Sequence, residues 1–173
     1  KIQIIEMNYI IGDIGNTSTR VCLFNKSKIL SSIIFDTKKI FLKGFFKKII
    51  NRFSKKNLKN EILFSCVVPL ALKEIKKNLK KTNYRVLEIK SLNLKKMIKI
   101  NIKNFKQLGS DRIVNSIKGK EFKNCLIIDF GTATTFDIVK NETYEGGVIA
   151  PGIKSSIKNL SQSTALLPMF DLK

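Results

Sequence analysis

Two polar loops of similar composition lie between apolar runs, 116 residues apart in the chain. The first run is IIGDIGNTSTRVCLFN, from Ile10, and the second is LIIDFGTATTFDIVKN, from Leu126. Aligned without gaps, they share residues at Ile11/Ile127, Asp13/Asp129, Gly15/Gly131, Thr19/Thr135 and Asn25/Asn141. Glycine lets a backbone approach a ligand closely, amides and hydroxyls bind phosphate oxygens, and a carboxylate binds a cation. Two such loops facing across a cleft would bind the phosphates of one nucleotide from both sides.

A single loop of this kind is better interpreted as a turn stabilised by its own aspartate and threonine side chains. Its repetition favours phosphate binding and indicates an internal duplication. Other nucleotide-binding signatures are absent from the sequence, which has no G-x-x-x-x-G-K-[ST] and no G-x-G-x-x-G. The string Asp129-Phe130-Gly131 matches a protein-kinase D-F-G by chance, because the other kinase motifs are missing. Any nucleotide is therefore expected at the repeated loops.

Hydrophobic patterning predicts the elements that position these loops in an α/β fold. We expect strands over residues 8–13, 19–25, 28–35, 61–68 and 84–89, and helices over residues 42–53, 69–79 and 107–122. The first three strands should form a meander, and the fourth should be buried and parallel. The first helix has one apolar stripe, which favours packing on the sheet over binding to a membrane. Gly146-Gly147 and Pro151-Gly152 are expected to bracket one more short strand.

Composition excludes several classes of function. The chain has no histidine, which removes Ser-His-Asp and Cys-His catalysis and imidazole metal ligands. Its three cysteines, Cys22, Cys66 and Cys125, are far apart in apolar runs and are expected to be buried free thiols. The longest uncharged apolar stretch, residues 62–72, is well short of the ~20 residues that span a bilayer. We therefore expect a cytoplasmic protein with no membrane partner.

A net charge of +20, from 33 basic and 13 acidic residues, raises the possibility of nucleic-acid binding. Only four of the basic residues are arginine, although arginine suits phosphate and base recognition best. The lysines are spread along the chain, which favours a compositional bias with lysines on solvated faces. We expect no specific nucleic-acid partner, and only non-specific polyanion binding at low salt.

Four motifs occur in a characteristic order: D-x-G-N-T at Asp13, G-x-D-R at Gly109, D-x-G-T-A-T-T at Asp129 and G-G-x-I-x-P-G at Gly146. Together they resemble the type III pantothenate kinases, members of the actin-like ATPase superfamily that are also known as Bvg accessory factors. The resemblance extends from about Met7 to Pro168. It implies a duplicated ribonuclease-H-like fold, with an N-terminal domain over residues 7–120 and a partial C-terminal domain over residues 123–173.

The resemblance also implies an activity and a set of site residues. The activity is ATP-dependent phosphorylation of pantothenate to 4'-phosphopantothenate, the first step of coenzyme A biosynthesis. Mg²⁺ would accompany ATP, a monovalent cation (K⁺ or NH₄⁺) would bind at Asp129, and the enzyme would be a homodimer. The ATP-binding residues implied are Asp13, Ile14, Gly15, Asn16, Thr17, Ser18, Thr19, Arg20 and Thr132. The pantothenate-binding residues implied are Gly109, Ser110, Asp111 and Arg112, with Asp111 as the catalytic proton acceptor.

Elementary chemistry agrees with the role of Asp111, because a chain without histidine needs a carboxylate to accept the proton of an attacking alcohol. Arg112 could form a planar fork to the substrate carboxylate or to a phosphate. An isolated Asp-Arg pair would be interpreted as a helix ion pair or an N-terminal cap. The position of this pair beside a glycine and between the two phosphate loops favours function.

Two positions depart from the family pattern: Ile102 stands where the family has an aromatic residue, usually tyrosine, and Phe105 where it has proline. The family tyrosine contacts substrate, so these departures bear on pantothenate affinity. The second half has only three predicted strands and one helix, which predicts a fragment of a longer protein. The alternative function is a nucleotide-binding accessory or regulatory protein without kinase activity; Asp111 argues against it, and Ile102 argues for it.

Overall fold

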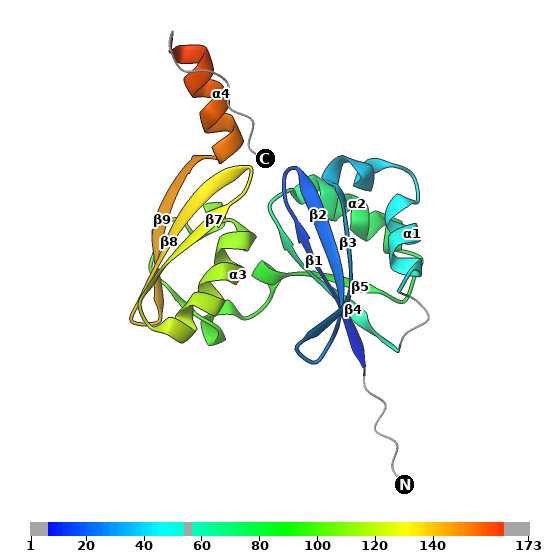
Figure 1. The fold of residues 1–173 in the computed structure, drawn as a ribbon. Coiled ribbons are helices and arrows are strands. Elements are labelled where there is room, and N and C mark those ends of the chain that lie inside the picture. The colour runs from blue at the N-terminus through cyan, green and yellow to red at the C-terminus, as the bar shows by residue number, and fades with distance from the viewer. Residues whose placement is uncertain (1–6, 54–56, 165–173) are drawn as a thin grey trace. The chain divides into compact units, whose positions relative to one another are not determined.

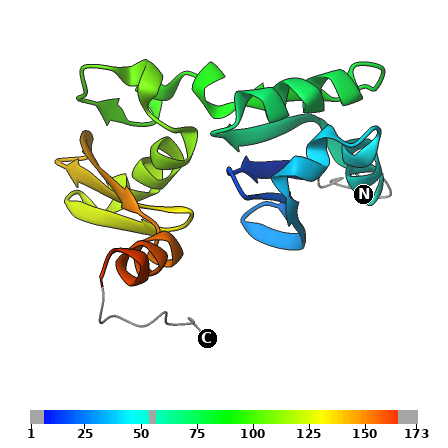
Figure 2. The same ribbon diagram turned by 90° about the horizontal axis from the view of Figure 1, so that it is seen from above.

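The computed structural model describes residues 7–53 and 57–164, which fall into two compact units. The first comprises residues up to Leu92 together with Gly109–Asp111, and the second comprises Asn93–Leu108 and the residues from Arg112 onward. Each unit contains its own β-sheet (Figures 1 and 2). The domain limits drawn from the sequence follow the repeat rather than the packing, and they stay a prediction.

The first unit is built on a five-stranded sheet in the order β3-β2-β1-β4-β5. Its strands are β1 (Asn8–Ile14), β2 (Ser18–Asn25), β3 (Lys28–Asp36), β4 (Leu58–Cys66) and β5 (Arg85–Glu88). The first three form the antiparallel meander that was predicted, and β4 pairs in parallel with both β1 and β5. Helix α2 (Pro69–Leu79) makes the crossover that parallel strands require. The carboxyl ends of β1, β4 and β5 therefore lie at one edge of the sheet.

Helix α1 (Phe45–Asn51) is shorter than the predicted helix over residues 42–53. It begins after Gly44, whose φ of 69° is left-handed and ends the regular spacing there. Leu42 lies before the helix and is 58% exposed, so its assignment to the apolar stripe was wrong. Phe46 and Ile50 are buried in the core of the sheet with residues of α2, so the preference for packing on the sheet is confirmed.

The second unit has a four-stranded sheet in the order β6-β9-β8-β7. Its elements are α3 (Ser110–Gly119), whose first two residues belong to the first unit, β6 (Lys99–Ile100), β7 (Cys125–Phe130), β8 (Ala133–Lys140), β9 (Thr143–Pro151) and α4 (Ile153–Ser163). Helix α3 is shorter than the predicted span of residues 107–122, because 3-10 turns occupy residues 105–107 and 120–122. Gly146 and Gly147 lie inside β9, so the prediction that they precede a short strand was wrong.

The meander of the first unit recurs in the second. In each, a two-residue turn joins the second and third strands, between β2 and β3 and between β8 and β9. Both pairs of strands shift register at the equivalent place, between Leu23 and Phe24 in one and between Ile138 and Val139 in the other. The shared irregularity supports the duplication inferred from the sequence.

The loops between the first two strands of each meander differ by one residue. The pair Ile14 and Thr19 encloses four residues, whereas the pair Phe130 and Thr134 encloses three. Thr134, rather than Thr135, is therefore the structural equivalent of Thr19, and both side chains are buried. The ungapped alignment of the two runs was wrong by one residue after the loop.

None of the helices among the described residues is long and apolar enough to cross a membrane.

The packing of α1 can be tested with two aliphatic residues of equal size. We expect Ile50→Ala to lower the free energy of unfolding by about 2–5 kcal/mol, because it leaves a cavity in the core. Leu42→Ala removes the same number of carbon atoms from an exposed site and should change it by less than about 0.5 kcal/mol. Urea unfolding followed by circular dichroism measures both, and equal losses would contradict this account of the helix.

Candidate functional site

The first loop, Gly15–Ser18, follows β1 at the carboxyl edge of the first sheet. The Gly15 N–H donates to the Ser18 carbonyl over 3.0 Å and closes the loop. Asn16, Thr17 and Ser18 are exposed, whereas Ile14 and Thr19 are buried and support the loop through the core. The polar groups that could reach a phosphate are therefore concentrated at the tip.

Thr37, which had no predicted role, stabilises this loop through hydrogen bonds. Its hydroxyl donates to the Gly15 carbonyl over 2.7 Å, and its backbone N–H donates to the Thr17 carbonyl over 3.0 Å. The Thr19 hydroxyl lies 3.0 Å from that of Thr37. Since Thr37 has one hydroxyl proton and directs it to Gly15, Thr19 is the donor between the two hydroxyls. Thr37 follows β3 in the 3-10 helix Thr37–Phe41, and its position gave no sequence signal.

The segment Gly109–Asp111 belongs to the first unit. The Ser110 hydroxyl donates to Oε1 of Glu88, at the end of β5, and Oε2 of Glu88 accepts the Lys90 N–H over 2.9 Å. Asp111 lies in the first turn of α3, where the helix dipole favours a carboxylate. A Cβ at Gly109 would collide with the Asp111 carboxyl group, so glycine leaves room for it.

Val67 links this segment to the first loop. Its N–H donates over 3.0 Å to the carbonyl of Ile14, the last residue of β1. Its Cγ1 would lie 3.6 Å from a Cβ at Gly109. The sequence-predicted proton acceptor and the first predicted phosphate loop therefore meet at one sheet edge, within one unit.

Cys66, at the end of β4, lies near the acids of this edge. Burial raises the pKa of the Cys66 thiol, and the negative charges of Glu88 and Asp13 raise this pKa further, while a hydrogen bond to Val68 opposes the shift. The thiol donates to the Val68 carbonyl over 3.2 Å. Cys66 is therefore a protonated thiol rather than a nucleophile. All three cysteines are free thiols, as predicted, but only Cys22 is buried; Cys66 and Cys125 are partly exposed, so their predicted burial was wrong.

The second loop, Gly131–Ala133, closes in the same way as the first, through a 3.0 Å hydrogen bond from the Gly131 N–H to the Ala133 carbonyl. Gly152 occupies the place after β9 that Thr37 occupies after β3. A Cβ at Gly152 would lie 2.5 Å from the Gly131 carbonyl oxygen and closer still to that of Thr132. The first loop is thus held by a hydroxyl, whereas the second lies so close to Gly152 that a side chain there would collide with it.

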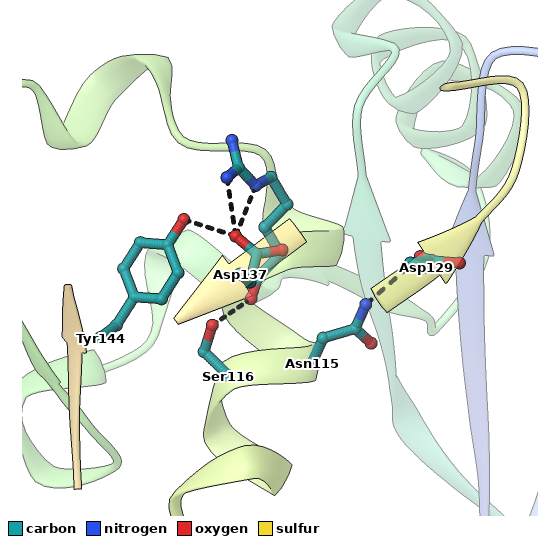
Figure 3. Close-up of polar contacts among 6 residues, drawn as sticks. Asn115, Ser116, Asp129, Asp137 and Tyr144 are labelled. Carbon is teal, nitrogen blue, oxygen red and sulfur yellow. Dashed lines mark hydrogen bonds and ion pairs between the residues drawn. The ribbon is translucent and has the colours of Figure 1, made fainter. Parts of the chain in front are cut away.

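Asp129 is exposed at the end of β7, and its Oδ2 accepts a 3.3 Å hydrogen bond from the Asn115 amide of α3 (Figure 3). A carboxylate is an oxygen ligand of the kind that a hard cation prefers. Within residues 7–53 and 57–164, no group of three or more acidic or cysteine side chains could hold a metal. Asp129 by itself could provide one oxygen ligand to a cation.

Arg112 pairs with Asp137 of β8. Its Nε and Nη2 lie 2.8 and 2.7 Å from Oδ1 of Asp137, and the Tyr144 hydroxyl donates to the same oxygen over 2.7 Å (Figure 3). Asp137 is fully buried and Arg112 is 12% exposed. The sequence analysis missed Asp137, although an aspartate inside an apolar strand is a usable signal because such a residue needs a partner.

The two residues that depart from the family pattern lie in the second unit. Ile102 packs beside β9, where its Cγ2 would lie 3.5 Å from a Cβ at Gly146. Phe105 opens a 3-10 turn and is 37% exposed. The remaining predicted residues divide between the units: the first loop, Gly109, Ser110 and Asp111 in the first, and Arg112, Asp129 and Thr132 in the second. That the two loops face each other across a cleft stays a prediction.

Sequence comparison places the chain among known enzymes. The sequence model of a family described as type III pantothenate kinase matches residues 9–173. A type III pantothenate kinase from Pelagibacter ubique is 45% identical over 168 residues, which cover 95% of this chain and 67% of that protein. The chain spans about two thirds of the length of the curated relatives it matches.

Structure comparison agrees on the fold. A Campylobacter jejuni protein assigned to the Baf family of transcriptional activators superposes with a TM-score of 0.54 at 23% identity, covering 95% of this chain and 68% of that one. The ethanolamine utilization protein EutJ from Carboxydothermus hydrogenoformans superposes with a TM-score of 0.53 at 10% identity, covering 94% and 58%. The predicted actin-like ATPase fold is confirmed.

The support of the first loop by Thr37 can be tested with an isosteric change. Thr37→Val removes the hydroxyl between Gly15 and Thr19, so we expect faster hydrogen exchange at the Gly15–Ser18 amides. We also expect a loss of about 1–3 kcal/mol in the free energy of unfolding, because buried polar groups lose a partner. Thr82→Val is the matched control, since the Thr82 hydroxyl donates to the Leu79 carbonyl at the end of α2. An exchange rate in the loop that changes no more than in this control would contradict the role of Thr37.

Proposed function

Because this chain belongs to the type III pantothenate kinase family, we propose that the full-length protein transfers the γ-phosphoryl group of ATP to the primary hydroxyl of pantothenate. The products are 4'-phosphopantothenate and ADP, and the reaction is the first step of coenzyme A biosynthesis. The family and the kinase class predicted from the sequence are confirmed by the matches. The observation that carries the proposal for this chain is the position of Asp111 at the same sheet edge as the first loop.

Asp111 is proposed as the proton acceptor. As the pantothenate hydroxyl oxygen attacks the γ-phosphorus, its proton passes to the Asp111 carboxylate and the bond to ADP breaks. The hydrogen bond from Ser110 to Glu88 and the space at Gly109 hold this turn of α3 in place. Fixing the acceptor in this way supports the reaction, because correct orientation of the reacting groups lowers the barrier.

The ATP phosphates are proposed to bind the exposed polar residues of the first loop, flanked by Asp13 and Arg20, and Thr132 of the second. Asp13 and Arg20 face each other across β1 and β2, and both are exposed. In the first unit the loop is held by two hydrogen bonds from Thr37, which fix its backbone before a phosphate arrives. A preordered loop supports phosphate binding, because less conformational entropy is lost on binding.

The finer parts of the proposal come from family resemblance. Asp129 would hold a monovalent cation, K⁺ or NH₄⁺, and Mg²⁺ would bind together with ATP and neutralise charge on its phosphates. We further propose that the enzyme acts in the cytoplasm as a homodimer. Arg112 is assigned to the carboxylate of pantothenate, with Gly109 and Ser110 shaping the same subsite.

A coupled assay of ADP release, with and without pantothenate, tests the function of the full-length protein. Pantothenate-dependent release is expected. ATP binding without pantothenate-dependent turnover would instead favour the accessory protein that the sequence left open as an alternative.

The role of Asp111 is tested by Asp111→Asn, which keeps the shape of the side chain but cannot accept the proton. We expect turnover to fall by about 100-fold or more, with ATP affinity by calorimetry unchanged. Glu121→Gln is the control, because it neutralises an exposed acid that pairs only with Lys118 among the contacts of the described residues. A near-normal rate in the Asp111→Asn variant would remove Asp111 from the mechanism.

A further inference from the structure

A buried acid in the second unit, Asp137, forms an ion pair with Arg112. The side chain of Asp137 is 0% exposed. Its Oδ1 accepts hydrogen bonds from Nε of Arg112 and from the Tyr144 hydroxyl, and forms an ion pair with Nη2 of Arg112 (Figure 3). Its Oδ2 is buried without a hydrogen-bond partner among the described residues. Burying a carboxylate costs free energy unless it is paired, so packing alone does not account for an aspartate at this position.

The duplicated meander provides an internal reference for this position. The residue of β2 that corresponds to Asp137 is Cys22, which is buried and whose thiol donates to the Ser32 hydroxyl over 3.4 Å. The same strand pairing therefore forms without an acid at this place. The acid at position 137 is therefore specific to the second unit, where its partner is Arg112.

Gly147, directly opposite Asp137 in the pairing of β8 and β9, makes room for the guanidinium group. A Cβ at Gly147 would lie 2.8 Å from Nη2 of Arg112 and would collide with the Phe136 carbonyl oxygen. Tyr144, the other residue at this place, is 1% exposed. An acid, a hydroxyl and a glycine from two strands thus surround one edge of the Arg112 side chain.

We propose that Asp137 and Tyr144 are positioning residues that fix the orientation of Arg112 so that its guanidinium group recognises the carboxylate of pantothenate. The inference rests on the proposed function and deepens it. Arg112 follows Asp111 directly in the first turn of α3. The Asp137 contact involves the Nε edge of the side chain, and a guanidinium that is held at one edge loses less conformational freedom when another group binds. Asp137 and Tyr144 therefore determine selectivity for an acid over its neutral amide.

The test compares pantothenate with its primary amide, which keeps the reacting hydroxyl and lacks the negative charge. Binding by calorimetry and ADP release are measured for the full-length parent protein and for the Tyr144→Phe and Asp137→Asn variants. We expect the preference for the acid to fall several-fold in the first variant and tenfold or more in the second. The KM for ATP and the kinetics with the amide should stay unchanged. Tyr84→Phe removes a hydroxyl from a half-buried tyrosine of the first unit and is the control.

A double-mutant cycle separates positioning from general stability. In an Arg112→Lys background, Asp137→Asn should have little further effect on the acid-to-amide ratio, because the two residues act through one group. Equal losses for acid and amide, additive effects in the cycle, or a raised KM for ATP alone would overturn the inference. If Asp137→Asn does not fold, the Tyr144→Phe comparison decides, since that change is isosteric and leaves the ion pair in place.

The two proposals fail in different ways. A parent protein that binds the acid more tightly than the amide but shows no pantothenate-dependent turnover would contradict the proposed function and leave the role of Asp137 standing. A parent protein that turns over both compounds without preference would overturn the inference and leave the kinase function standing.

Discussion

The parallel pairing of β4 between β1 and β5 is the constraint on which the first unit depends. Because the three strands run in the same direction, the Gly15–Ser18 loop, Val67 and Glu88 all arrive at one edge of the sheet. The Val67 N–H continues the pairing beyond β4 by donating to the Ile14 carbonyl. The Glu88 carboxylate accepts a hydrogen bond from the hydroxyl of Ser110, which lies 22 residues further along the chain. The parallel strand pairing, the Val67 backbone hydrogen bond and the Ser110–Glu88 hydrogen bond thus bring to one place a proton acceptor and a phosphate loop that are distant in sequence.

The two units share one backbone arrangement in their meanders but carry different side chains at equivalent positions. Both meanders keep the same turn and the same irregularity of pairing, yet the position after the third strand is Thr37 in one and Gly152 in the other. At the centre of the second strand, likewise, the buried residue is Cys22 in the first unit and Asp137 in the second. A repeated backbone therefore accommodates residues of different chemistry at equivalent positions.

Local pattern was sufficient for most elements, because strand alternation and helical spacing are local properties of the chain. Pro69 fixed the start of α2, and the meander followed from three β-branched runs. The start of α1 was misjudged because spacing alone counts Leu42 with the stripe, whereas the left-handed backbone of Gly44 lets the helix begin only at Phe45. The pairing of Arg112 with Asp137, 25 residues apart and on different elements, depends on tertiary packing that no local pattern contains.

The protonated state of Cys66 has a consequence for how this edge responds to oxidants. Peroxide and disulfide exchange act on the thiolate, and the raised pKa leaves little of that form at neutral pH. A sulfur atom close to Asp13 and Glu88 therefore resists conversion to sulfenic acid. Burial of the thiol, reinforced by the negative charges of Glu88 and Asp13, thus protects this sheet edge from oxidation at Cys66.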